Sequence, residues 1–153
     1  MITTQVESFV GALTELREIF PRHHDELGLF KDRMPLRPQY EEYIKRERAG
    51  RLFLVTTRKN GRIAAYYTAQ IQPGFHYGDT LTGTMDLCYV IPEERGRGLI
   101  MPLMRCVEKE LKRRGVQIWY AGYKTHNDLQ MPGLLDAWGF QSADTYRAKW
   151  LDT

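Results

Sequence analysis

The first third of the chain carries its apolar residues at the spacing of helices. Residues 4–7 have the form of a capping box, which is typical of a helix N-terminus. The apolar positions that follow at helical spacing are Val6, Phe9, Val10, Leu13 and Phe20. We expect Pro21 to close this helix and residues 22–25, which include two histidines, to form a polar connection. Pro38 then opens a second predicted helix, which Gly50 stops.

The middle of the chain changes to the shorter period of strands. Residues 52–57 and 63–71 predict two strands, and the Asn-Gly pair between them is a strong signal for a two-residue hairpin turn. These two strands should therefore pair antiparallel. After a longer turn, residues 81–91 predict a third strand, which ends at Pro92.

Helical spacing returns after the third strand, and Gly115 ends the predicted helix. Its apolar stripe consists of Ile100, Leu103, Met104, Val107 and Leu111. Residues 116–123 predict a buried strand, and the alternation of strand, helix and strand implies a parallel pairing. A short helix over residues 129–138 follows, and Phe140 and residues 145–151 supply closing strand material. This order of elements predicts an α/β fold built on a mixed sheet.

Length and composition fit one globular domain. The chain has 153 residues, of which 42% are hydrophobic and 27% charged, so we expect a single domain over residues 1–153. No apolar run approaches the roughly 20 residues of a membrane span. Residues 1–5 lack the features of a secretion signal, so we expect a cytoplasmic protein without a membrane partner.

The cysteines and the net charge say little about the function of the chain. Cys88 and Cys106 have the spacing of neither a disulfide framework nor a metal site, so we expect both to be buried and reduced, and we expect no metal. The net charge of +3 is too small to argue for nucleic acid as a partner. It suits an anionic small ligand equally well.

A turn rich in glycine and arginine joins the third predicted strand to the next helix, with the sequence Arg95-Gly96-Arg97-Gly98. A helix N-terminus offers unpaired N–H donors and about half a positive charge. Glycines let a backbone approach a ligand closely, and arginines add charge. These properties predict a phosphorylated ligand; the alternative is a plain turn with solvated arginines. No Gly-Lys-Ser/Thr follows, as it would in a Walker loop, and the third glycine of a dinucleotide fingerprint is missing.

Residues 89–99, with the sequence Tyr-Val-Ile-Pro-Glu-Glu-Arg-Gly-Arg-Gly-Leu, resemble the acetyl-CoA-binding motif of GNAT acetyltransferases, usually written Gln/Arg-x-x-Gly-x-Gly/Ala. The resemblance extends to the strand at residues 116–123. It also includes residues 134–140, which are similar to the final helix of the family with its Gly-Phe ending. It covers roughly residues 63–151, and the first sixty residues match in general plan.

A narrower resemblance concerns three smaller features. The spacing of Asp86 from residues 89 and 90, the turn at residues 125–128, and the ending from Tyr146 to Lys149 are similar to a branch common in phages and prophages.

The family resemblance implies a mixed, mostly antiparallel sheet with a central parallel pair and splayed strands, flanked by about four helices. It implies an enzyme that transfers an acetyl group from acetyl-CoA to a primary amine, on a small molecule or a protein, by direct attack in a ternary complex. The backbone of Tyr89 and Val90 would pair with the pantetheine arm, and the Val90 N–H would polarise the thioester carbonyl. The N–H groups that would cradle the diphosphate belong to Arg95, Gly96, Arg97, Gly98, and Leu99 or Ile100.

Two positions depart from the family pattern. Glu93 stands where the family usually has Gln or Arg, and a neighbouring arginine or exposure to solvent would offset its charge. Leu135 stands where the family often has the tyrosine that protonates the leaving thiolate, so that acid is absent.

Acetyl transfer needs an amine without its proton and a proton source for the thiolate. Asp86 lies four residues before Val90, so in a regular strand its side chain shares a face with Cys88 and Val90. It is the candidate base or partner of the substrate ammonium; the alternative is a polar residue that fixes the sheet. Tyr146 and His126 are the candidate acids, with a core position and a solvated loop as their respective alternatives. His76 and Tyr77 are candidates to border an acceptor pocket.

Three readings compete. The first is the acetyltransferase, and the second is a catalytically weak or inactive module with the GNAT fold that binds CoA or a partner protein. The third is a basic domain that binds nucleic acid through Arg95, Arg97 and the helix end at residues 109–114. A homodimer through the last strands is a further expectation from the family resemblance.

Overall fold

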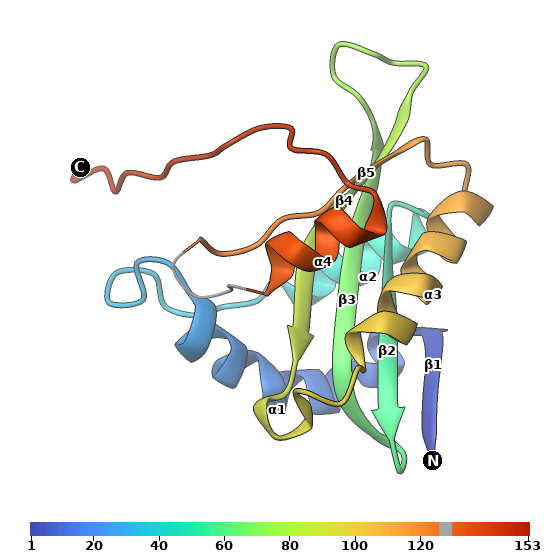
Figure 1. Cartoon of the computed structure of the whole chain (residues 1–153). Coiled ribbons are helices and arrows are strands. Elements are labelled where there is room, and N and C mark those ends of the chain that lie inside the picture. The colour runs from blue at the N-terminus through green and yellow to red at the C-terminus, as the bar shows by residue number, and fades with distance from the viewer. Residues whose placement is uncertain (126–129) are drawn as a thin grey trace.

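The computed structural model describes residues 1–125 and 130–153, and shows a five-stranded sheet with helices on both faces (Figure 1). The strands are β1 (Ile2–Glu7), β2 (Leu52–Lys59), β3 (Arg62–Pro73), β4 (Leu81–Val90) and β5 (Ile118–Tyr120). The helices are α1 (Phe9–Leu27), α2 (Tyr40–Arg48), α3 (Ile100–Arg113) and α4 (Met131–Trp138), with a 3₁₀ turn at Pro92–Glu94. Neighbours β1 to β4 pair antiparallel and β4 pairs with β5 in parallel. The predicted α/β fold with a mixed, mostly antiparallel sheet is confirmed.

The N-terminal segment forms a strand, so the helix start predicted at residues 4–7 is wrong. The β-branched residues of Ile2–Glu7 favour extended backbone, and this segment pairs with β2 over its whole length. The helix begins at Phe9, and its N-cap is Ser8, whose side chain accepts a hydrogen bond from the Gly11 N–H at 3.3 Å. A true N-cap thus lies just beyond the apparent capping box.

Helix α1 also continues past Pro21 to Leu27, so residues 22–25 are helical and not a connection. A proline inside a helix removes one hydrogen bond to the residue four positions earlier. Both Pro21 and Arg17 are exposed, so water can satisfy the carbonyl that loses its partner. The extra turns bring His23 and Glu26 to the edge of the sheet.

The C-terminal third differs most from the prediction. Strand β5 has three residues, and its ends are not buried, because Ile118 and Tyr120 are each 41% exposed. Residues 140–153 form no helix or strand, so the predicted closing strand at residues 145–151 is wrong. Charged residues alternate with the apolar ones in this tail, which packs by Trp150 against Phe30 and Arg33 of the α1–α2 connection. The parallel pair consequently lies at one edge of the described sheet rather than at its centre.

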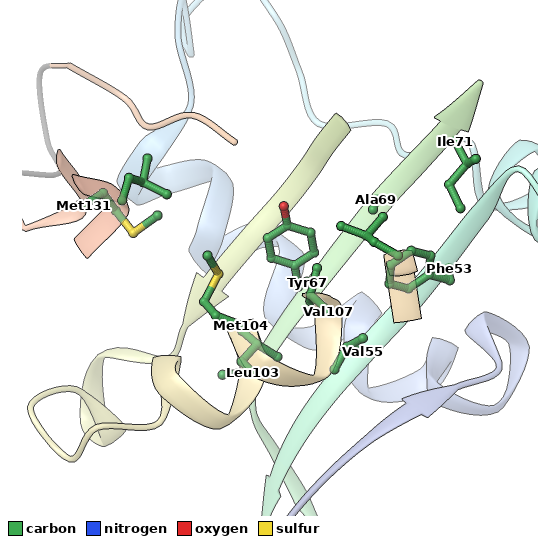
Figure 2. Packing of buried hydrophobic residues seen from close by; sticks show 12 residues of the cluster. Phe53, Val55, Tyr67, Ala69, Ile71, Leu103, Met104, Val107 and Met131 are labelled. Atoms are coloured by element: carbon green, nitrogen blue, oxygen red, sulfur yellow. The ribbon is translucent and has the colours of Figure 1, made fainter. Parts of the chain in front are cut away.

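Two hydrophobic clusters hold the helices to the sheet. On one face, Leu103 and Val107 of α3 pack with α4 against strand residues such as Val55 and Tyr67 (Figure 2). On the other face, the cluster is formed by α1 with partly buried residues of α2, and its buried members are Phe9, Ala12, Leu16, Ile19, Phe20, Leu54, Ile63, Tyr66 and Tyr89. Burying one such side chain contributes about 1.5–3 kcal/mol. We call these two sides the α3/α4 face and the α1/α2 face.

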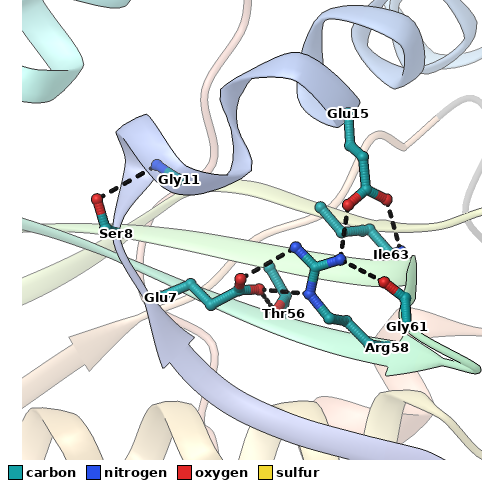
Figure 3. Close-up of polar contacts among 8 residues, drawn as sticks. All are labelled: Glu7, Ser8, Gly11, Glu15, Thr56, Arg58, Gly61 and Ile63. Carbon is teal, nitrogen blue, oxygen red and sulfur yellow. Dashed lines mark hydrogen bonds and ion pairs between the residues drawn. The ribbon is translucent and has the colours of Figure 1, made fainter.

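A charged network fixes α1 and β1 on the hairpin of β2 and β3 (Figure 3). The Arg58 guanidinium donates to Glu7 at 3.0 Å and to Glu15 at 2.6 Å, and it also donates to the Gly61 carbonyl at 2.7 Å. The second oxygen of Glu15 accepts from the Ile63 N–H at 2.9 Å. These groups are mostly shielded from water, so the network holds the start of α1 in one place on the sheet.

Among the helices of the described residues, none has both the length and the apolar character that a membrane crossing requires.

Candidate functional site

The turn between β4 and α3 is shaped by two glycines with left-handed backbone. Gly96 has a φ of 77° and Gly98 a φ of 74°, a region that disfavours side chains. A Cβ at either position would meet open space, so the requirement for glycine is conformational and not steric. The two residues turn the chain from the end of β4 into the first turn of α3.

This turn leaves backbone donors available at the N-terminus of α3. Within the described part of the chain, the backbone N–H groups of residues 96–99 have no hydrogen-bond partner, and Leu99 provides no side-chain cap. Unpaired N–H groups and the helix dipole together attract anions. The turn therefore fits the diphosphate of a nucleotide-like ligand.

The two arginines of the turn differ from the expectation that both add charge to a phosphate seat. The Arg95 guanidinium donates to Glu26 of α1 at 2.5 and 2.9 Å and to the Val90 carbonyl at 3.0 Å, and it lies over the Tyr89 ring. The hydrogen bond from Arg95 lowers the pKa of Glu26, so the pair stays ionic. Arg97 is more than half exposed and lies 3.6 Å from Glu94, so its guanidinium is the more accessible to a ligand in solution.

Glu93 is exposed and ion-paired, as the sequence reading required for an acid beside a diphosphate. Its carboxylate lies 2.5 Å from the Arg22 guanidinium, and its side chain is 61% exposed. Its own backbone N–H and then Arg22 lower the pKa of this carboxyl. The negative charge at this position is offset in both of the expected ways.

Next to the turn, β4 has an open edge. Strand β5 pairs with residues Thr82, Gly83 and Thr84, and in the described residues no strand continues beside the rest of β4. The Ile91 N–H bonds to the Ala64 carbonyl on the β3 side at 2.9 Å. Because successive N–H groups of a strand alternate in direction, the Val90 N–H points to the open edge and that of Tyr89 points to β3. The Val90 N–H is therefore directed at the open edge, where the predicted pairing with a pantetheine arm would need it, whereas the Tyr89 N–H is directed at β3.

A β-bulge changes the direction of the Asp86 side chain. The β3–β4 register shifts here: Thr68 pairs with Leu87 and Ala69 with Met85, which leaves Asp86 as an extra residue. The prediction that Asp86 shares a face with Cys88 and Val90 is wrong, because that inference assumed a regular strand. Cys88 and Val90 pack on the α3/α4 face, while Asp86 faces α2.

Two hydroxyl groups hold the Asp86 carboxylate on the α1/α2 face. The Tyr43 hydroxyl of α2 donates to Oδ2 at 2.8 Å, and the Thr68 hydroxyl donates to the same oxygen at 3.0 Å. The Thr68 oxygen accepts in turn from the Leu87 N–H at 3.1 Å, which satisfies a backbone donor at the bulge. Burial and the charge of Asp86 raise the pKa of Tyr43, so it stays a donor. No described residue bonds to Oδ1, which is available to a ligand.

His23 belongs to this side of the molecule and was missed by the sequence reading. Its Nδ1 lies 2.6 Å from the Tyr66 hydroxyl, and its ring stacks on Tyr89 with centroids 4.3 Å apart. Burial, together with the charges of Lys124 and Arg95, lowers the pKa of His23 to about 4 against the opposing effect of Glu26, so the ring is neutral near pH 7. The sequence did contain a signal for this position. The helical spacing of Leu16 and Phe20 on the apolar stripe of α1 continues beyond Pro21 at His23 and Leu27.

The other predicted site residues are not brought together. Tyr146 is 90% exposed in the irregular tail, so its predicted place in a closing strand is wrong. His126 lies outside the described residues. His76 and Tyr77 lie in the connection between the end of β3 at Pro73 and the start of β4 at Leu81, and Tyr77 is 74% exposed. Leu135 is buried in the core on α4, so this helix offers no hydroxyl there.

The cysteines and the basic helix end were also assigned roles from the sequence. Among residues 1–125 and 130–153, Cys88 and Cys106 form no disulfide, and both are partly rather than fully buried. At the end of α3, Arg113 and Arg114 both bond to Glu110, whose pKa these contacts lower to about 2. Lys112 lies 3.5 Å from Glu108, so two acids of the same helix offset part of the charge of the four basic residues at this helix end.

The chain is similar to known acetyltransferases. It matches the model of the acetyltransferase (GNAT) family over residues 13–140. Its structure is similar to a predicted acetyltransferase from Clostridium acetobutylicum solved with acetyl-CoA, with a TM-score of 0.72 and 17% identity over 100% of this chain and 96% of the other. A ribosomal-protein-alanine N-acetyltransferase from Brucella melitensis gives a TM-score of 0.71 and 13% identity over all of both chains.

A third similar structure is the glucosamine-6-phosphate N-acetyltransferase of Arabidopsis thaliana, with a TM-score of 0.72 and 13% identity over 99% of each chain. At these identities the likeness concerns the fold. No curated protein matches the chain. Nothing in these comparisons supports the narrower resemblance to a phage branch.

Proposed function

The chain belongs to the GNAT family of acetyltransferases, and we propose that it transfers an acetyl group from acetyl-CoA to a primary amine on a small molecule or a protein. Members of this family are acyl-CoA-dependent N-acetyltransferases. The observation that carries the proposal is the glycine turn with unpaired N–H groups at the N-terminus of α3, directly beside the open edge of β4. We take residues 1–153 as one acetyltransferase domain, because α1 and α2 pack on the same sheet as α3 and α4.

In this proposal the backbone holds the cofactor. The unpaired N–H groups of residues 96–99, with Ile100 as a further candidate, bind the diphosphate, whereas the Arg95 N–H bonds to the Pro92 carbonyl at 3.3 Å. The Val90 N–H binds the thioester carbonyl, where negative charge develops during attack. Acetyl-CoA supplies an activated acyl group, which a neutral amine can attack directly. Arg97 adds charge from the exposed side of the turn.

In this proposal Asp86 binds and deprotonates the amine substrate. Its free Oδ1 is a hydrogen-bond acceptor on the α1/α2 face, and its other oxygen is fixed by Tyr43 and Thr68. Such a carboxylate can bind a substrate ammonium and take its proton, directly or through water. The amine therefore approaches from the α1/α2 face, and the bulge in β4 brings the carboxylate to it.

The proton for the leaving thiolate comes from solvent in the simplest form of this proposal. Leu135 supplies no acid, and the exposed Tyr146 would reach the thiolate only after a rearrangement of the tail. His126 stays a candidate acid. A homodimer through the last strands also stays a prediction.

The lack of a placed acid on α4 favours one alternative, a catalytically weak or inactive module that binds CoA or a protein through the same turn. Release of CoA thiol in the presence of an amine separates the two functions. The module would bind acetyl-CoA and release no thiol with any amine.

Calorimetric titration with acetyl-CoA tests the proposal. We expect micromolar binding by the natural protein and no binding by the Gly96→Asp, Gly98→Asp double variant, because both substitutions strain the turn and add negative charge. Gly115→Asp is the matched control: Gly115 is also left-handed, with a φ of 79° and open space around its Cβ, but lies at the other end of α3. It should bind normally. No binding by the folded natural protein at millimolar acetyl-CoA would overturn the proposal.

A further inference from the structure

We propose that Glu26 of α1 is a positioning residue of the cofactor site, an inference that rests on the proposed function. Glu26 lies far in sequence from the glycine turn, and it carries the charge that should repel a diphosphate. Its contacts nevertheless give it a supporting part in the site.

The Glu26 carboxylate bonds to residues on both sides of the Val90 N–H, which is the donor at the open edge of β4. Glu26 accepts two hydrogen bonds from Arg95, at 2.5 and 2.9 Å, and one from the Tyr89 hydroxyl at 2.8 Å. Tyr89 precedes Val90 in β4, and Arg95 is the first residue after the 3₁₀ turn. Charge-assisted bonds of this bidentate kind are among the strong ones in proteins. The end of β4 and the start of the glycine turn are therefore fastened to α1 at a single point.

The same arginine then orients the Val90 peptide. Arg95 Nε donates to the Val90 carbonyl at 3.0 Å. In extended backbone the N–H and C=O of one residue point to the same edge of the strand. A guanidinium that holds the Val90 carbonyl therefore keeps the Val90 N–H directed at the open edge. Glu26 determines where this guanidinium lies, so it acts on Val90 through Arg95.

A purely electrostatic role of Glu26 and a positioning role predict opposite changes in the affinity for acetyl-CoA when Glu26 is replaced. If Arg95 contacted the diphosphate, the loss of Glu26 would free the guanidinium and remove a repulsive charge, and acetyl-CoA would bind more tightly. If Glu26 positions Arg95 and Val90, its loss must weaken binding. The sign of the change separates the two roles.

The first experiment compares Glu26→Gln with Glu93→Gln by calorimetry with acetyl-CoA. Glutamine keeps the size and an acceptor oxygen, so the fold should persist, which thermal melting checks. Glu93 is also beside the turn, but it bonds to Arg22 and not to Arg95 or Val90. We expect Glu26→Gln to raise the Kd about tenfold. Glu93→Gln should leave it unchanged or lower it. Equal or tighter binding by Glu26→Gln would overturn the inference.

A double variant tests whether Glu26 and Arg95 act as one unit. Arg95→Gln in the Glu26→Gln background should raise the Kd no further, because either substitution alone already removes the bidentate ion pair between Glu26 and Arg95. An additional loss of affinity in the double variant would mean that Arg95 contacts the ligand itself and would contradict the inference.

Amide hydrogen exchange of the protein without ligand makes the test independent of cofactor binding. We expect faster exchange over residues 89–99 in Glu26→Gln and unchanged exchange in Glu93→Gln. Unchanged exchange in Glu26→Gln would overturn the inference even if acetyl-CoA bound. If the natural protein bound no acetyl-CoA, the proposed function would be overturned. The exchange result would still show whether Glu26 holds residues 89–99 in place.

Discussion

The two faces of the sheet place functional groups by different means. On the α3/α4 face, a core that contains Phe53 and Tyr67 beside its aliphatic residues seats α3, and the proposed binding groups are main-chain N–H donors in a glycine turn. On the α1/α2 face, aromatic rings, hydroxyls, an imidazole and carboxylates hold one another through side-chain contacts. In the proposed function, the first face recognises a ligand through its backbone conformation, and the second through the identity of single side chains. A change of side chain should therefore matter far more on the second face.

The faces also differ in how far apart their partners lie in the sequence. The cofactor turn is one continuous stretch, so the residues that determine it are neighbours. The partners of Asp86 are 43 and 18 residues away, and Glu26 is 69 residues from Arg95. Local sequence can specify the first arrangement, whereas the second exists only after the chain has folded.

The largest expected effect comes from Asp86→Asn. We expect kcat/KM for the amine to fall about 100-fold or more, since asparagine neither takes a proton nor neutralises an ammonium. The Kd of acetyl-CoA should change by less than about twofold, because the turn lies on the other face. Steady-state kinetics and calorimetry measure the two quantities. An unchanged kcat/KM would mean that the α1/α2 face carries no chemistry, and the comparison of the faces would fail.

A smaller effect, on the free energy of unfolding, is expected from the protonation of His23 when the pH is lowered. Its pKa is about 4 in the folded protein, below the ordinary value of 6.5, so the unfolded chain takes up a proton first as the pH falls. The free energy of unfolding should drop by about 2 kcal/mol between pH 7 and pH 5 from this residue. Urea unfolding at both values measures the change.

The matched control replaces both members of the pair, His23→Phe with Tyr66→Phe, which keeps the stacked rings and leaves no hydroxyl without a partner. This double variant should lose the acid sensitivity that His23 causes. The same pH dependence in both proteins would show that the imidazole is not held neutral by its surroundings.

The smallest effect should follow Tyr43→Phe. This change removes one of the two hydroxyls that fix Asp86, and one hydrogen bond of this kind is worth about 1 kcal/mol. We expect kcat/KM to fall about threefold to tenfold. Tyr40→Phe is the control on the same helix, because its hydroxyl makes no contact with Asp86 in the described residues. Equal effects of the two variants would point to the packing of α2 instead of the orientation of Asp86.

The parts of the fold that the sequence predicted well are those set by local signals. The Asn-Gly hairpin, the amphipathic stripe of α3 and the glycines at its N-terminus are each decided by adjacent residues, and each is confirmed. The backbone conformation of the proposed cofactor turn could therefore be predicted from the motif. For the proposed acceptor side, the sequence indicated Asp86 as a candidate but predicted the wrong face of the sheet for its side chain.

The misses have physical causes that lie outside any local window. A single extra residue in β4 reverses the inside–outside alternation, and nothing in the sequence around Asp86 marks the bulge. Pro21 is an ordinary helix stop unless the lost hydrogen bond faces water, as it does here. Residues 2–7 become a strand because they pair with the edge of β2, whereas residues 145–151 pair with no described strand and pack by Trp150 on the α1–α2 connection.

The docked tail also provides an optical reporter. Of the three tryptophans, Trp119 and Trp138 lie with the core, while Trp150 sits at the α1–α2 connection with Phe30 on one side and Arg33 close to its ring. Arg33 also bonds to Asp152 at 3.1 Å, so the last residues are tied to the same place. An indole in such a setting changes its emission when it is released into water. Replacing the two core tryptophans by phenylalanine would leave an unlabelled protein whose fluorescence follows the attachment of its own C-terminus in real time.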